Sequence, residues 1–160
     1  MSDWNPADGR CTCGVVRYRL HAKPLIVHCC HCTWCQRESG SAFAVNAVIE
    51  ASQVELLQGQ PVKAMLPSAS GKGQAFWRCT DCGVAVWSNY PQAGPRIHFI
   101  RVGTLEEPSR APPDIHIYTS TKQPWVILPD GVPAMPEFYN PANTWPAESL
   151  ARFKAARTAA

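Results

Sequence analysis

Residues 79–83 read CTDCG, and residues 11–14 read CTCG. Each stretch places two thiols on a tight turn, and the glycine that follows lets the backbone curl so that amide groups can face the sulfurs. Four thiolates from two such turns fill the corners of a tetrahedron, which is typical of a structural Zn²⁺ site. We therefore predict one structural zinc ion bound by the four cysteines of these turns, Cys11, Cys13, Cys79 and Cys82. The alternative, a redox-active dithiol at the second turn, lacks the strand-to-helix context of such motifs.

A third stretch, CCHCTWC at residues 29–35, predicts a different geometry. If it begins as an extended strand, Cys30 and Cys32 point to one side of the chain, and the residues before and between them point to the other. Cys35 follows three residues later, on the same face of a first helical turn. These three cysteines form a three-thiolate set that leaves one corner of a tetrahedron open. An open corner distinguishes catalytic zinc sites from structural ones.

Other interpretations of this stretch remain open. Cys29 or a histidine could close the site, or the cysteines could be buried core residues that bind no metal. Cys29 could also form a disulfide on oxidation or only pack. His31 has the wrong alternation for a ligand, so we interpret it as a residue that packs or positions a ligand.

The ligand type predicts the chemistry of an open three-thiolate site. Three thiolates donate so much charge that the zinc ion is a weaker Lewis acid than one held by three histidines. A soft metal with soft ligands is suited to capturing a thiol from outside and holding it as thiolate at neutral pH. The expected substrate therefore contains sulfur.

Short alternating runs of apolar and polar residues, separated by turn residues, predict an antiparallel β-protein. These runs are residues 15–20, 43–49, 54–57, 75–78, 84–88, 97–102 and 115–118. Thr33 as N-cap, with Gln36 three residues later and Gly40 as the end, predicts a short helix that begins inside the central cysteine stretch. A second helix is expected over residues 146–157, with one apolar face.

Composition limits the class of protein. The 160 residues are 46% apolar and 17% charged, which fits one domain over residues 1–160. Fifteen prolines and ten glycines disfavour an all-helical bundle. The net charge of +3 comes with dispersed lysines and arginines, so no nucleic-acid partner is expected.

The expected compartment follows from the cysteines and the apolar runs. The longest apolar run, residues 42–49, is far shorter than the roughly 20 residues needed to cross a bilayer, so no membrane partner is expected. The first fifteen residues lack the apolar core of a secretory signal, and we expect a cytoplasmic location. A reducing compartment keeps the eight cysteines free, which favours metal binding over disulfides.

The order of the motifs resembles one known family. CxCG at residues 11–14, CHCxxCQR at 30–37, GSAF at 40–43, RCxxCG at 78–83, VGTL at 102–105, PW at 124–125 and DGVP at 130–133 occur in this order. The same order is seen in the glutathione-dependent formaldehyde-activating (Gfa) family, which also includes centromere protein V. The resemblance covers about residues 11–139 and leaves residues 140–160 as a C-terminal extension.

The resemblance implies a fold, an activity and a set of site residues. It implies a β-tent fold with a structural zinc at Cys11, Cys13, Cys79 and Cys82 and a catalytic zinc at Cys30, Cys32 and Cys35. It also implies a carbon–sulfur lyase, S-(hydroxymethyl)glutathione synthase, that joins glutathione and formaldehyde, or another small aldehyde, reversibly. The alternative is a non-catalytic zinc-binding protein or an interaction module, and the module would need a basic surface that this sequence lacks.

Several other side chains have two interpretations each. Arg37 could meet a glutathione carboxylate or pair with Glu38 or Asp81. The large aromatic residues could line a pocket beside the zinc or fill the core of a small β-domain. These are Trp34, Phe43, Trp77, Trp87 and Trp125.

Overall fold

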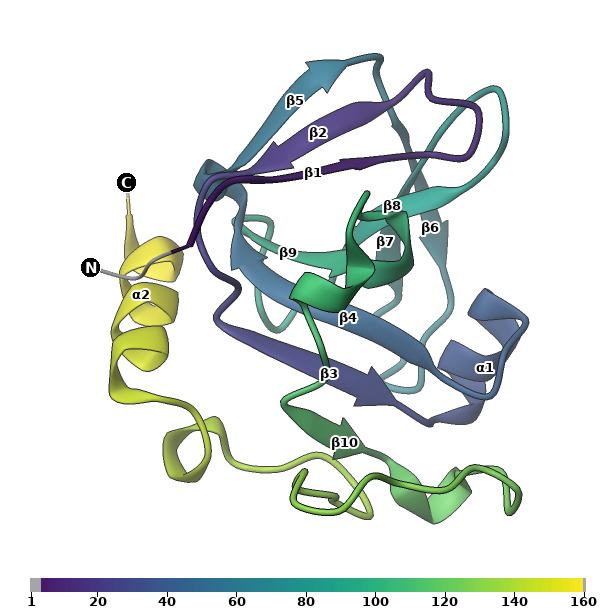
Figure 1. Ribbon diagram of the computed structural model, residues 1–160, viewed down its shortest axis with the longest axis vertical. Helices are drawn as coiled ribbons and strands as arrows, with labels where there is room; N and C mark the ends of the chain where they lie inside the picture. The colour runs from purple at the N-terminus through teal and green to yellow at the C-terminus, as the bar shows by residue number, and fades with distance from the viewer. Residues whose placement is uncertain (1–3, 160) are drawn as a thin grey trace.

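Two β-sheets and two α-helices make up the fold in the computed structural model, which describes residues 4–159 (Figure 1). The three-stranded sheet has the order β1 (Ala7–Arg10), β2 (Arg17–Leu20), β5 (Val54–Gln58). The seven-stranded sheet has the order β10 (Ile115–Ile117), β3 (Ile26–Cys30), β4 (Ala44–Glu50), β9 (Ile97–Arg101), β8 (Ala85–Asn89), β7 (Gln74–Arg78), β6 (Val62–Leu66). The predicted class, mainly β with a short helix in the cysteine cluster and a C-terminal helix, is confirmed.

One strand pairing departs from the antiparallel pattern. Among the paired strands of the described chain, β10 runs parallel to β3, and the other pairs are antiparallel. The two strands lie far apart in sequence, so a long connection can return the chain to the same end of the sheet, as parallel pairing requires. This pairing places His116 opposite Cys29 and Ile117 opposite Cys30.

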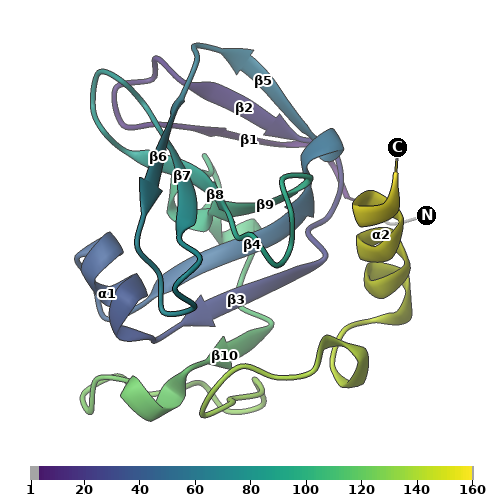
Figure 2. The same cartoon turned by 180° about the vertical axis from the view of Figure 1, so that it is seen from behind.

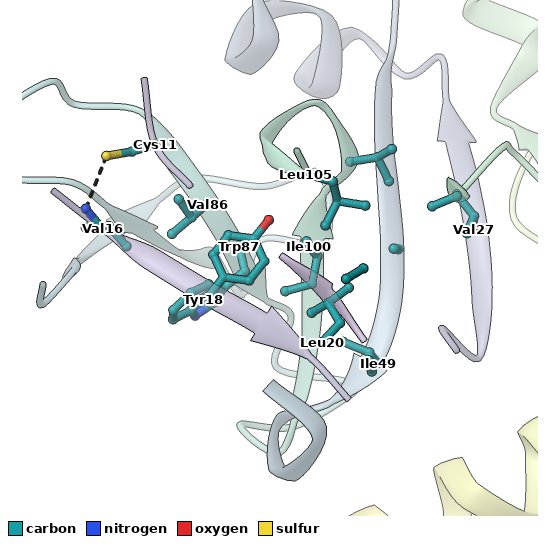
Figure 3. Packing of buried hydrophobic residues seen from close by; sticks show 14 of the residues in the cluster. Cys11, Val16, Tyr18, Leu20, Val27, Ile49, Val86, Trp87, Ile100 and Leu105 are labelled. Atoms are coloured by element: carbon teal, nitrogen blue, oxygen red, sulfur yellow. Dashed lines mark hydrogen bonds between the residues drawn. The ribbon is translucent and has the colours of Figure 1, made fainter. Parts of the chain in front are cut away.

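The first hydrophobic core fills the space between the two sheets. Tyr18 and Leu20 of β2 are fully buried there, against Trp87 of β8 and Ile100 of β9. Tyr18 and Trp87 pack edge to face, with ring centroids 5.7 Å apart, and Figure 3 shows these side chains meeting between the strands. A Cβ at Gly9 would lie 2.2 Å from the Tyr18 ring, so the close approach of β1 requires glycine.

A second core covers the opposite face of the seven-stranded sheet. Ile115 and Ile117 of β10 and Val48 of β4 pack there with Trp145, which comes from the segment after β10. Both views show this segment passing along the β3–β10 edge and ending in α2 (Figures 1 and 2). With both faces covered, every residue of β3 is buried.

Helix α2 (Ala147–Thr158) begins after Pro146, close to the predicted boundaries. Leu150 and Phe153 pack against the second core, as expected. The Arg152 guanidinium donates two hydrogen bonds of 2.8 Å to the two carboxylate oxygens of Glu50. Glu50 ends β4 and is 7% exposed, so this paired contact fixes the helix on the sheet. No helix among residues 4–159 is long and apolar enough to span a membrane.

We predict that Arg152→Gln lowers the free energy of unfolding by about 2 kcal/mol, because it leaves the Glu50 carboxylate buried without its cation. Urea denaturation followed by circular dichroism measures the change. Lys154→Gln, an exposed position on the same helix, is the control and should change stability by less than about 0.5 kcal/mol. Equal effects of the two substitutions would show that the ion pair does not hold the helix.

Candidate metal centre

The two cysteine turns predicted from the sequence lie together. The ligand atoms of this four-cysteine cluster all lie within 4.8 Å of one another, and its members are Cys11, Cys13, Cys79 and Cys82. The Cys13 sulfur is 3.5 Å from that of Cys11 and 3.6 Å from that of Cys79. Zinc–sulfur bonds of about 2.3 Å in a tetrahedron place the sulfurs about 3.8 Å apart. The donor set therefore fits a zinc ion.

Both turns have the same backbone design. The Cys11 N–H donates to the Val16 carbonyl at 3.1 Å, and the Cys79 N–H donates to the Val84 carbonyl at 3.0 Å. The glycine after each second cysteine has a φ of +78° or +73°, a left-handed conformation that favours glycine. The two motifs, CxCG and CxxCG, therefore fold into two similar turns that bring their cysteines together.

Backbone amides stabilise thiolates in this cluster. The Val16 N–H donates to the Cys11 sulfur at 3.3 Å, a contact drawn in Figure 3. The N–H groups of Cys13 and Val84 lower the pKa of Cys82 to about 6. Deprotonated sulfur is the form that binds a metal, so the predicted approach of amides to sulfurs is confirmed.

The second predicted cluster is also assembled. Cys30, Cys32 and Cys35 place their sulfurs within 4.8 Å of one another. Cys30 ends β3, Cys32 is extended with φ −66° and ψ 152°, and Cys35 lies in the first turn of α1 (Thr33–Ser39). The alternation argument is confirmed, because Cys29 and His31 belong to a different group of side chains.

The cap of α1 differs from the prediction by one residue. Cys32, not Thr33, is the N-cap, and its sulfur accepts the Cys35 N–H at 3.3 Å. A sulfur at this position takes the place of the hydroxyl that usually satisfies the free amide. Gln36 instead donates its side-chain amide to the His31 carbonyl at 2.7 Å. The helix ends at Gly40, with φ +67°, as predicted.

Hydrogen bonds within the three-cysteine cluster favour negative charge on one sulfur. Thiol donors at Cys30 and Cys35, together with backbone N–H groups, hold the pKa of Cys32 well below its ordinary value. The same bonds raise the pKa of Cys30. A metal ion that binds this cluster must therefore displace protons from the remaining thiols.

A third group, Cys29, His31 and His116, was not predicted. Its ligand atoms lie within 4.8 Å of one another, and all three residues are buried. His31 Nε2 lies 2.9 Å from His116 Nδ1 and 3.6 Å from the Cys29 sulfur. Burial lowers the pKa of His31 to about 4. This Cys/His group could also hold a metal, and its position shows that Cys29 does not close the three-cysteine cluster.

Two cavities flank the three-cysteine cluster. Cys32 lines a cavity of about 470 Å³, and Cys35 lines a smaller one of about 230 Å³. Trp34 lines both cavities. The other aromatic residues considered for a pocket lie elsewhere: Phe43 packs on His31 with ring centroids 5.4 Å apart, Trp77 and Trp87 belong to the first core, and Trp125 is 70% exposed.

Three charged side chains line the smaller cavity. They are Arg37, Glu38 and Arg101. Glu38 forms an ion pair with Arg78 and not with Arg37, because Arg78 of β7 lies beside α1. Arg101 donates to the Asn46 side-chain oxygen at 2.9 Å and lies 3.9 Å from the Glu38 carboxylate. Of the alternatives considered for Arg37, the pairing with Glu38 is therefore not formed, and Arg37 lines the cavity.

Two tyrosines line the larger cavity. Burial and the charges of Cys35 and Cys30 raise the pKa of Tyr90. Burial and nearby thiolates also raise the pKa of Tyr118. Tyr118 has φ +55°, an uncommon conformation for a side chain of this size that is often found at functional sites. Both hydroxyls stay protonated near neutral pH and can donate hydrogen bonds beside the cysteine cluster.

Comparison with known proteins identifies the family of the chain. The family described as glutathione-dependent formaldehyde-activating enzyme matches residues 6–121, more than half of the chain. The chain belongs to this family. The match ends before the PW motif at residues 124–125 and the DGVP motif at residues 130–133, which also belong to the resemblance. A crystal structure of a Rhodobacter sphaeroides protein is similar with a TM-score of 0.47 and 21% sequence identity, covering 62% of this chain and 87% of that one.

Native mass spectrometry of the purified protein should detect two zinc ions, and a chelator such as EDTA should remove one before the other. An open three-cysteine site holds its ion less tightly than a closed four-cysteine site. Cys35→Ser should lack only the readily removed ion, whereas Cys29→Ser should keep both. A single zinc ion in the wild type, or loss of the resistant ion from Cys35→Ser, would contradict the assignment of the two clusters.

Proposed function

We propose that this protein is a zinc-dependent carbon–sulfur lyase of the S-(hydroxymethyl)glutathione synthase type. It adds a thiol such as glutathione reversibly to formaldehyde or another small aldehyde. The observation that carries the proposal is a cluster of three cysteines, two of which each line a cavity, with no fourth ligand among the described residues. The family match over residues 6–121 agrees with this activity.

The two cysteine clusters have different roles in this proposal. The four-cysteine cluster binds a structural zinc ion, and Cys30, Cys32 and Cys35 bind the catalytic one. A zinc ion held by these three residues would supply the positive charge that lowers the pKa of an incoming thiol. Cys29 takes no part, because its sulfur groups with His31 and His116 and not with the three cysteines.

The surrounding residues orient the two reactants. Arg37 and Arg101 at the smaller cavity offer cations to the carboxylates of glutathione. The thiol sulfur then forms a bond to the aldehyde carbon, and the carbonyl electron pair moves to oxygen. Tyr90 and Tyr118 donate hydrogen bonds to that oxygen. The oxygen takes a proton from water to give the hydroxyl group, and water receives the proton that the thiol gives up. Holding both reactants close together lowers the entropic part of the barrier.

We place this reaction in the cytoplasm and treat the chain as a single domain. All eight cysteines are free thiols, and a reducing compartment keeps them so. The segment after residue 121 packs on the matched part through the second core, which fits one folding unit.

The test compares adduct formation from glutathione and formaldehyde with the uncatalysed rate, because thiols add to formaldehyde without a catalyst. Wild-type protein should accelerate the reaction, and Cys32→Ala should reduce the rate to background because it removes a ligand of the open site. Cys29→Ala removes a neighbouring thiol that groups with His31 and His116, and this variant should keep the acceleration. NMR of the exchanging adduct measures all three rates. Equal rates for wild type and Cys32→Ala, both at background, would exclude the proposed activity.

A further inference from the structure

The larger cavity is much bigger than formaldehyde requires. Its volume of about 470 Å³ lies within the roughly 300–1,000 Å³ of sites that bind whole small molecules. Formaldehyde has one heavy atom more than water, which occupies about 30 Å³ in the liquid. Most of this cavity would stay filled with water if formaldehyde were the only aldehyde it received.

Seven Phe, Tyr and Trp side chains line the cavity. One wall is the sheet face that carries Phe99 of β9, and the facing wall comes from the chain after β10. That second wall contains Phe138, Trp145 and Phe153. Arg157 lies over the Phe153 ring at 5.3 Å, and no other Arg, Lys, Asp or Glu among the described residues lines the cavity. Such a lining favours a flat, uncharged group.

Hydrogen bonds hold the aromatic wall in place. The Trp145 indole N–H donates to the Tyr139 hydroxyl at 2.7 Å. That hydroxyl can then donate its own proton to His28 Nε2 at 2.6 Å. Burial lowers the pKa of His28 to about 4, so the imidazole is a neutral acceptor near pH 7. The contact of Arg152 with Glu50 fixes the following helix, and the cavity is therefore formed before a ligand arrives.

This wall lies outside the part of the chain that matches the family. The match ends at residue 121, and Phe138, Trp145 and Phe153 all follow it. The three cysteines lie inside the match. The C-terminal segment therefore completes a cavity whose other lining residues, and the cysteine cluster, lie in the matched region.

We propose that this cavity binds the aromatic ring of an uncharged arylalkyl aldehyde and places its carbonyl carbon beside Cys32. The inference rests on the proposed function and names its substrate class. Glutathione carries charges at both ends, so its carboxylates fit the smaller cavity with Arg37 and Arg101 better than the aromatic one. The thiol gives its proton to water, its sulfur bonds to the carbonyl carbon, the π electrons move to oxygen, and that oxygen takes a proton from water. The product is an aryl-substituted hemithioacetal.

The first part of the test measures binding without reaction. The probe is 2-phenylethanol, which has the ring and chain of phenylacetaldehyde but no carbonyl. Isothermal titration calorimetry should show binding to zinc-loaded wild type. Phe138→Ala should weaken it by roughly fivefold, because one ring contact is lost. Phe138 is 50% exposed, so the variant should fold. Leu57→Ala, a 43% exposed position on β5 in the other sheet, is the control and should bind as wild type does.

The second part measures turnover with glutathione. The acceleration over the uncatalysed rate should be about 30-fold larger for phenylacetaldehyde than for formaldehyde, the expected gain from burying one phenyl ring. Phe138→Ala should lower the ratio of the acceleration for phenylacetaldehyde to that for formaldehyde, and Leu57→Ala should leave this ratio unchanged.

The outcomes separate the two proposals. Binding of 2-phenylethanol without acceleration of either aldehyde reaction supports the cavity assignment and overturns the proposed function. Equal acceleration for both aldehydes, with no binding of 2-phenylethanol, overturns the cavity assignment and leaves the proposed function standing.

Discussion

The alternation of side chains at the end of β3 is the constraint on which the site depends. Successive residues of an extended strand face opposite ways, so Cys30 and Cys32 lie on one side while Cys29 and His31 lie on the other. A shift of one residue would exchange the two sets and place a mixed Cys/His group at the cavities. Pairing of β3 with β4 on one edge and β10 on the other holds this register.

The seven-stranded sheet is covered on both faces, and each face carries one of the two cysteine clusters. The three-stranded sheet of β1, β2 and β5 covers one face of the seven-stranded sheet, and the C-terminal segment covers the other. The four-cysteine cluster joins the turn after β1 to the turn after β7 and supports the first core, where Cys11 and Cys79 are buried. The three-cysteine cluster belongs to the second core, where cavities reach Cys32 and Cys35.

Local sequence rules predicted the parts of the site that depend on neighbouring residues. Spacing alone separated Cys30, Cys32 and Cys35 from Cys29, and the Cys-Gly turns gave the four-cysteine cluster. The rules missed β3 as a complete strand, because it is buried on both faces and lacks alternation. His116 could not be placed next to His31, since only the parallel pairing of distant strands brings them together. The larger cavity could not be located either, because part of its lining comes from the chain after β10, far in sequence from the cysteines.

Cadmium-113 NMR tests the central claim, an open coordination position at Cys30, Cys32 and Cys35. Cd²⁺ prefers thiolates as zinc does, and each cluster should give its own resonance. Added glutathione should move one resonance toward the position of the four-cysteine site, as a fourth sulfur joins the metal, and leave the other unchanged. Two resonances that both ignore glutathione would contradict the account.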